Sequence, residues 1–217
     1  MPSAARGAVL VLTAALLLAT GIASAGRLSL SSQTMRATWA RFEWVSEFGT
    51  IRCPLTLEGS FHSRTIAKVA RALIGAVTRA AFNQEACASG SMAAFNGSES
   101  YNGTRPANTL PWHLSYESFS GSLPIISSLN LLFSRFRFGL TLPAVFTCQY
   151  GTTTDNLSLR ISSERAGALT ELAWVAGSDQ ITLFRRDSGF CPGTWRFLTP
   201  APVTELGTTA RLTLTLI

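Results

Sequence analysis

Alternation of apolar and polar side chains with a period of two is the feature that most constrains the fold of this chain. Ile51, Cys53, Leu55 and Leu57 fall on one side of an extended segment, with mostly polar side chains between them. The same spacing recurs in the later segments 144–150, 157–161, 181–183 and 211–217. Because successive side chains of a β-strand point to opposite faces of a sheet, the pattern predicts half-buried strands.

Turn-forming residues separate these segments. Glycine stands with Ser, Thr, Asp or Glu at 58–60, 151–155, 176–179 and 187–189. Many short strands joined by such turns are typical of antiparallel sheets packed face to face. We therefore expect an all-β antiparallel sandwich, of immunoglobulin-like or Greek-key type, formed by a single domain over residues 26–217.

The segment 65–82 does not alternate cleanly. Ile66, Val69, Leu73 and Val77 recur at helical spacing, and the basic residues of the segment fall close to a separate face. Gly75 argues against a helix, because glycine in a helix interior is less favourable than alanine by about 1 kcal/mol. Two alternatives stay open for this segment, an amphipathic helix and an irregular strand.

Residues 1–25 have the three parts of a cleavable signal peptide. Arg6 supplies a positive charge, Ala8–Thr20 is apolar, and Ala23-Ser24-Ala25 places small residues at the cleavage site. The apolar part is shorter than the roughly 20 residues that a membrane-spanning helix needs, which disfavours an uncleaved anchor. We expect a mature chain that begins at Gly26, is secreted or held in the cell envelope, and has no transmembrane segment.

The cysteines predict disulfides. All four lie in the expected mature chain, at Cys53, Cys87, Cys148 and Cys191. An even number of cysteines in an exported protein favours two disulfide bonds, and three pairings are possible. The sequential pairing, Cys53 with Cys87 and Cys148 with Cys191, is our preferred one. A zinc site is disfavoured, because its ligands usually lie only a few residues apart.

The charge of the chain is basic but dispersed. Eighteen Lys and Arg residues face 12 Asp and Glu residues, for a net charge of +6. Arg185-Arg186 is the only adjacent basic pair, so the sequence contains no polybasic run. Solubility explains this balance better than an anionic partner does, and the expected export argues against nucleic acid.

The segment Leu110–Leu114 holds the most distinctive candidate residues, Trp112 and His113. Trp112 could be a stacking platform for a sugar ring, with His113 as an acid or base. The alternative places Trp112 in the core at a strand start and His113 on the outer face, and the large apolar gain of burying an aromatic ring favours it. No G-x-S-x-G motif, phosphate-binding loop or metal-ligand cluster is found, so we assign no catalytic residue, cofactor or metal.

Several short motifs follow one another in a familiar order. They are Cys53–Ser60, Ile74–Thr78, Leu110–Tyr116, Gly121–Ile125, Cys148–Tyr150 and the terminal Leu-Thr-Leu-Ile217. In this order they resemble a group of uncharacterised secreted proteins from actinobacteria. The resemblance implies a bacterial, exported and β-rich protein, and it assigns neither an activity nor site residues.

Two functions from different classes follow from these patterns. The first is a non-enzymatic binding or structural module of the cell envelope, with a polymer or a protein as its partner. The alternative is a secreted hydrolase that acts on an envelope polymer. A contact between His113 and a serine, or a pair of carboxylates in a cleft, would favour the enzyme.

Overall fold

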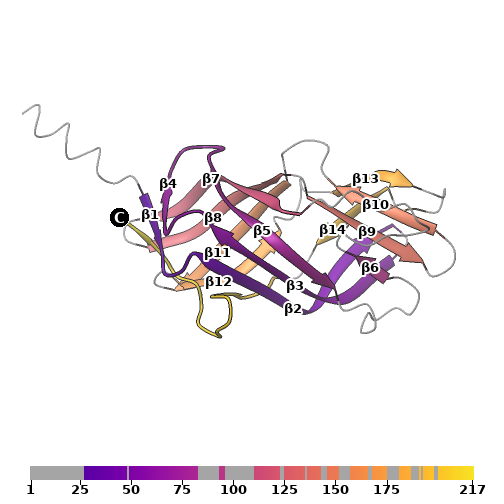
Figure 1. The fold of residues 1–217 in the computed structure, drawn as a ribbon, viewed down its shortest axis with the longest axis horizontal. Helices are drawn as coiled ribbons and strands as arrows, with labels where there is room; N and C mark the ends of the chain where they lie inside the picture. Colours follow the sequence, from indigo (N-terminus) through magenta and orange to yellow (C-terminus); the bar gives the residue numbers. More distant parts are fainter. Residues whose placement is uncertain are drawn as a thin grey trace, which may run out of the picture.

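The computed structural model describes residues 27–47, 49–82, 93–95, 110–122, 125–134, 136–142, 146–151, 157–165, 168–174, 181–186, 191, 193–197 and 200–217. The expected signal peptide and Cys87 lie outside these residues. Within them the chain forms strands and turns and no helix, and every strand pairing is antiparallel, which confirms the all-β antiparallel class (Figure 1).

The strands follow one another along the chain with these bounds: β1 (Arg27–Leu30), β2 (Thr34–Ser46), β3 (Gly49–Phe61), β4 (Thr65–Ala67), β5 (Leu73–Phe82), β6 (Ala93–Phe95), β7 (Trp112–Ser122), β8 (Ile125–Ser134), β9 (Arg137–Leu142), β10 (Phe146–Gly151), β11 (Leu157–Arg165), β12 (Ala168–Trp174), β13 (Ile181–Arg186), β14 (Thr194–Phe197), β15 (Val203–Thr204) and β16 (Leu214–Leu216).

One long sheet contains most of these strands, in the order β12-β11-β8-β7-β5-β3-β2-β14-β13-β10-β9-β6. The edge of β2 has two neighbours, since β15 pairs with it at Ala37 and β14 pairs with it at Trp44 and Val45. The sheet folds back at both ends, because β12 lies near β15 and β6 lies near β5. A small sheet, β16-β1-β4, lies beside β8.

The hairpin of β2 and β3 therefore belongs to two parts of the molecule. We call the strands β5, β7, β8, β11, β12 and β15 the β8 part, and the strands β14, β13, β10, β9 and β6 the β10 part. In Figure 1 the β8 part lies mainly on the left and the β10 part on the right, and β2 and β3 run from one to the other.

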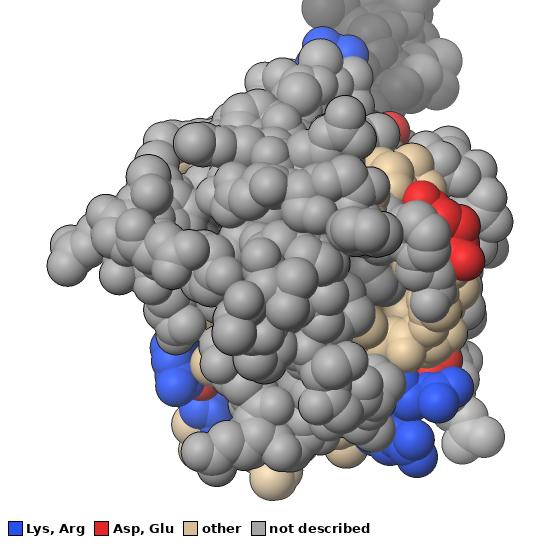
Figure 2. All heavy atoms as spheres, turned by 90° about the vertical axis from the view of Figure 1, so that its right-hand side faces the viewer, with Lys and Arg blue, Asp and Glu red and all other residues tan. Residues whose placement is uncertain are grey.

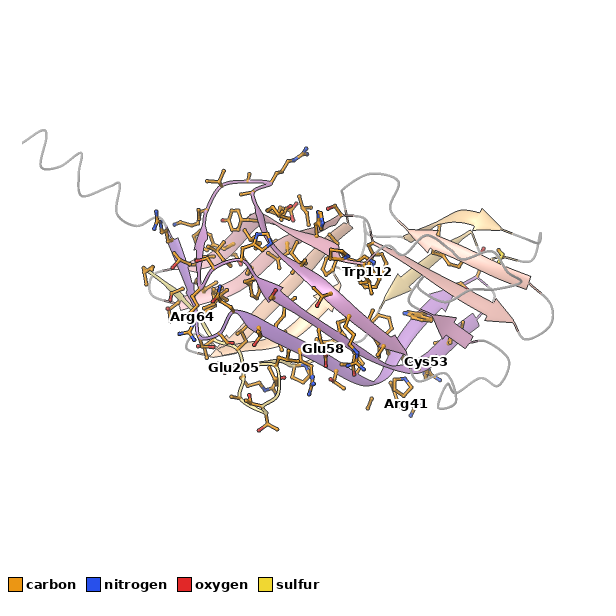
Figure 3. The ribbon with its side chains drawn as sticks, in the orientation of Figure 1. Arg41, Cys53, Glu58, Arg64, Trp112 and Glu205 are labelled. Atoms are coloured by element: carbon orange, nitrogen blue, oxygen red, sulfur yellow. A yellow bond between two sulfur atoms is a disulfide. The ribbon has the colours of Figure 1, made fainter. Side chains whose placement is uncertain are left out.

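A bulge near Arg41 lets β2 serve both parts. Trp39 lies opposite Leu55 and Phe42 lies opposite Cys53, so β2 advances by one residue more than β3 between these pairs. Strict alternation would turn Trp39 and Phe42 to opposite faces, whereas the bulge leaves both buried, with 2% and 1% of their surface exposed. Arg41 is exposed at this bend (Figure 3).

The core follows the alternation expected from the sequence. In β3 the side chains at Ile51, Cys53, Leu55 and Leu57 are all buried, and those between them are partly exposed. Aromatic rings fill the bend between the two parts, where Phe42 packs edge-on against Trp39 and against Trp44 at centroid distances of 5.1 Å and 5.6 Å. The rings of Trp39, Phe42 and Trp44 thus serve packing, as expected from the large apolar surface that each of them buries.

The segment 65–82 is not a helix. It forms β4, a turn and then β5, and Arg71 in the turn has a left-handed φ of 65°, which ends any regular element there. The apolar stripe expected for a helix is divided, because Ile66 and Val77 are buried whereas Val69 and Leu73 are exposed. The irregular-strand alternative is the correct one.

Close approach of β5 to β3 explains the glycine that argued against a helix. A Cβ atom on Gly75 would lie 3.0 Å from the Cα atom of Phe61, and nearer still to the carbonyl oxygen of Ser60. A Cβ atom on Gly59 would lie 2.9 Å from the Cα atom of Val77. These neighbours are main-chain atoms held by sheet hydrogen bonds, so only glycine fits at either position.

Replacing Gly75 by alanine is expected to lower the free energy of unfolding by about 1–3 kcal/mol, because the new methyl group would push β3 and β5 apart. Urea unfolding followed by tryptophan fluorescence measures the change. Gly193→Ala is the matched control, since the one atom of the described residues that a Cβ atom there would meet is Oε1 of Glu47, at 3.7 Å. An equal loss of stability in both variants would contradict the close-approach explanation.

Candidate binding surface

The structure separates the two candidate residues of the sequence analysis. Trp112 begins β7 directly after Pro111, which follows a cis peptide bond, and its ring is 1% exposed. The ring centroid lies 4.5 Å from that of Phe136, inside the molecule (Figure 3). A ring buried in this way has no face to offer a sugar, so the core interpretation of Trp112 is correct and the stacking platform is wrong.

His113 lies on the opposite face of β7 and is half-buried. Its cross-strand neighbour on β8 is Ser134. Among the described residues, no hydrogen bond joins His113 to a serine hydroxyl. The geometry therefore does not supply the His–Ser contact that would favour a hydrolase.

Polar side chains pair across β7 and β8 on this outer face. A bulge after Tyr116 brings Ser118 opposite Asn130 and Ser120 opposite Ser128. Asn130 donates a hydrogen bond from Nδ2 to the Ser118 hydroxyl at 2.8 Å, and the hydroxyls of Ser120 and Ser128 share another. We call these four residues the serine–asparagine ladder.

The side chains of the ladder range from buried to solvent-exposed. Ser128 is 2% exposed, Ser118 and Asn130 are half-buried, and Ser120 is exposed. An asparagine side chain carries two N–H donors and a carbonyl acceptor, and the bond to Ser118 uses one of those donors. Hydroxyl and amide groups held in register by main-chain pairing are suited to bind a ligand that has many hydroxyl groups itself.

The turn between β4 and β5 is held against β7. The Arg71 N–H donates to the Tyr116 carbonyl at 2.6 Å, and the Tyr116 N–H donates to the Ala72 carbonyl at 2.9 Å. The Lys68 ammonium lies 4.8 Å from the centroid of the Phe119 ring. We call residues 68–73 the basic turn. Burial of the Tyr116 side chain raises the pKa of its hydroxyl.

Charges on the outer face of β2, β3 and β5 are paired. Glu58 accepts bonds from Arg36 at 2.8 Å and from Arg79 at 3.1 Å, and Glu43 pairs with Arg52. Partial burial raises the pKa of Glu58, but the hydrogen bonds and charges of the two arginines outweigh it and hold that pKa below its usual value. This face fits a solvated surface rather than a catalytic site.

The β10 part is held by a disulfide bond within it and by a hydrogen bond to the residue that follows β2. Cys148 of β10 is bonded to Cys191, as the preferred pairing predicts, with 5.6 Å between the Cα atoms. Cys53 is disulfide-bonded as well, and Cys87, its expected partner, lies outside the described residues. The Gly193 N–H donates to Glu47 at 2.7 Å, and this bond lowers the pKa of Glu47. Figure 2 shows acidic groups beside the basic ones on the described surface of this end.

In the part of the chain that the structure describes, no group of three or more His, Cys, Asp and Glu side chains is placed to hold a metal ion. No helix of that part is long and apolar enough to cross a membrane.

Comparisons with known proteins add no relative. The chain matches no protein-family model, and it matches neither a curated protein nor a solved structure. The resemblance to secreted actinobacterial proteins is thus neither supported nor contradicted.

Sequence reasoning missed both surfaces described here. The ladder residues are ordinary serines and one asparagine in the printed sequence, and only the register of β7 and β8 brings them together. The basic turn lies within the segment 65–82, in which the spacing of apolar residues is compatible with a helix. Its one signal in the sequence is the group of cations around Val69 and Leu73.

Proposed function

We propose that this protein is an exported, non-enzymatic binding module that attaches to a hydroxyl-rich polymer of the cell envelope. The observation that carries the proposal is the serine–asparagine ladder, which presents cross-strand pairs of hydroxyl and amide groups on one face of β7 and β8. The signal peptide expected in residues 1–25 supports the location.

The ladder is organised before a ligand arrives. Serine and asparagine are short side chains, and the two hydrogen bonds already restrict their rotation. Binding therefore loses little side-chain entropy, which is a main cost of polar recognition. Residues on the same face of a strand repeat every two positions, so the ladder can meet successive hydroxyl groups of a linear polysaccharide.

Co-sedimentation with insoluble cell-wall polysaccharide tests the proposal. The wild-type protein is expected to sediment with the polymer, and Ser118→Ala/Asn130→Ala is expected to weaken binding about tenfold, the effect of losing one or two hydrogen bonds. Circular dichroism establishes that the variant is folded.

A second hydroxyl pair offers a matched control. Thr38 and Thr56 lie side by side on β2 and β3, with 3.4 Å between their hydroxyl oxygens. Thr38→Ala/Thr56→Ala removes as many polar groups from another exposed face and should leave binding unchanged. Failure of the wild-type protein to sediment, or equal weakening in both double variants, would overturn the proposal.

A further inference from the structure

We propose that the basic turn and the adjoining edge of the small sheet dock onto an anionic lipid bilayer. The surface consists of cations and exposed aliphatic side chains at one end of the molecule. Its members are Arg27, Lys68, Val69, Arg71, Leu73 and Ile217, and we call it the β1–β4 rim. The rim is separate from the serine–asparagine ladder, so this proposal does not depend on the polymer.

Exposed aliphatic residues gather at this rim. In the part of the chain that the structure describes, the exposed large apolar side chains are Val69 at 60%, Leu73 at 49%, Leu206 at 39% and Ile217 at 56%. Only Leu206 belongs to another region, the turn after β15. Single exposed apolar residues are ordinary, but a group of them indicates an interaction surface.

Main-chain pairing brings the rim together. Arg27 lies opposite Ala67 in the β1–β4 pairing, next to the start of the basic turn. On the other side of β1, Arg27 and Ile217 exchange hydrogen bonds of 3.2 Å and 2.9 Å. Figure 1 shows β1, β4 and the C-terminus at the same end of the molecule. Main-chain pairing thus places Ile217 on one side of Arg27 and the residue that precedes the basic turn on the other.

The charges of the rim favour an anionic partner. Lys68 and Arg71 belong to the basic turn, Arg27 lies beside it, and Glu117 is the acidic residue on the neighbouring stretch of β7. Each basic residue near an anionic membrane contributes roughly 1 kcal/mol to binding.

A bilayer explains the aliphatic residues better than a soluble polyanion does. Val69 and Leu73 gain free energy only where they leave water for an apolar medium, and the boundary between lipid headgroups and acyl chains supplies one. The position of the rim agrees with this partner, since Arg27 is the second residue of the expected mature chain, close to the signal peptide whose apolar part enters a bilayer during export.

Vesicle binding by the exported protein tests the inference. Vesicles of equal parts phosphatidylglycerol and phosphatidylcholine are expected to bind the protein, and phosphatidylcholine vesicles to bind it at least about tenfold more weakly. Val69→Ser/Leu73→Ser and Lys68→Gln/Arg71→Gln should each reduce binding about tenfold or more. High salt should weaken binding by the wild-type protein, because the contacts with headgroups are exposed.

Two control variants remove the same kinds of side chain from positions outside the rim. Leu206→Ser removes an exposed leucine from the turn after β15, and Arg41→Gln removes an exposed arginine at the β2 bulge. Both should bind vesicles like the wild-type protein. Absence of binding to anionic vesicles, or equal losses in the controls, would overturn the inference.

A competition experiment distinguishes a lipid bilayer from a soluble polyanion as the partner of the rim. Dextran sulfate carries negative charge without an apolar phase, so it should compete only weakly with vesicles. If the wild-type protein binds dextran sulfate as tightly as vesicles, and Val69→Ser/Leu73→Ser leaves that binding intact, the rim is a polyanion site and the bilayer proposal is wrong. If the wild-type protein binds the cell-wall polysaccharide but does not bind anionic vesicles, the bilayer proposal is wrong and the polysaccharide proposal stands.

Discussion

Replacement of Trp112 by alanine is expected to lower the free energy of unfolding by about 3–5 kcal/mol, the usual effect of deleting a buried aromatic ring. The ring is 1% exposed and packs against Phe136, which in turn packs edge-on against Phe133 at 6.1 Å. Its removal would leave a cavity beside β7 that main-chain pairing keeps from closing. Equilibrium urea unfolding of the purified protein measures the loss.

Two companion variants show whether the effect comes from packing. Trp112→Phe keeps an aromatic ring in the same space and should lose clearly less stability than Trp112→Ala. His113→Ala changes the adjacent residue on the outer face of β7 and should change stability by less than about 1 kcal/mol. If Trp112→Ala is as stable as the wild-type protein, the buried position of this ring is wrong.

Removal of the bond between Cys148 and Cys191 is expected to destabilise the protein by about 4 kcal/mol. The two cysteines are 43 residues apart in sequence, and a crosslink across a loop of this length restricts the unfolded chain by about that amount. The double variant Cys148→Ala/Cys191→Ala avoids free thiols, and urea unfolding gives the change.

Hydrogen exchange locates the effect of that double variant. Cys148 lies in β10, and Cys191 lies in the segment that leads into β14. Amides of β10, β13 and β14 should therefore exchange faster, whereas those of β7 and β8 should change least. A double variant with unchanged stability, or with uniform loss of protection, would contradict a local role for this bond.

Local alternation predicts strands well where a single sheet face is buried. Ile51, Cys53, Leu55 and Leu57 lie inside as their spacing requires, because each strand residue meets the core or the solvent according to its parity alone. The all-β class follows from the sequence for the same local reason, and the bond between Cys148 and Cys191 agrees with the pairing preferred among the three possible ones.

Features that depend on a distant strand could not be predicted. Gly75 is required by the main chain of β3 at Ser60 and Phe61, and nothing near Gly75 in the sequence reveals that approach. Val69 and Leu73 have helical spacing by coincidence, since both are exposed. The pairing of Ser118 with Asn130 depends on a bulge in β7, which shifts the register by one residue.

The hairpin of β2 and β3 has a consequence for how such a protein can evolve. Near Ala37 the edge of β2 is completed by β15, and near Trp44 it is completed by β14. Loss of either part would bare a row of main-chain N–H and C=O groups on β2, and bare strand edges promote aggregation. We therefore expect both parts to be gained, lost or exchanged between genomes together, as one unit of inheritance.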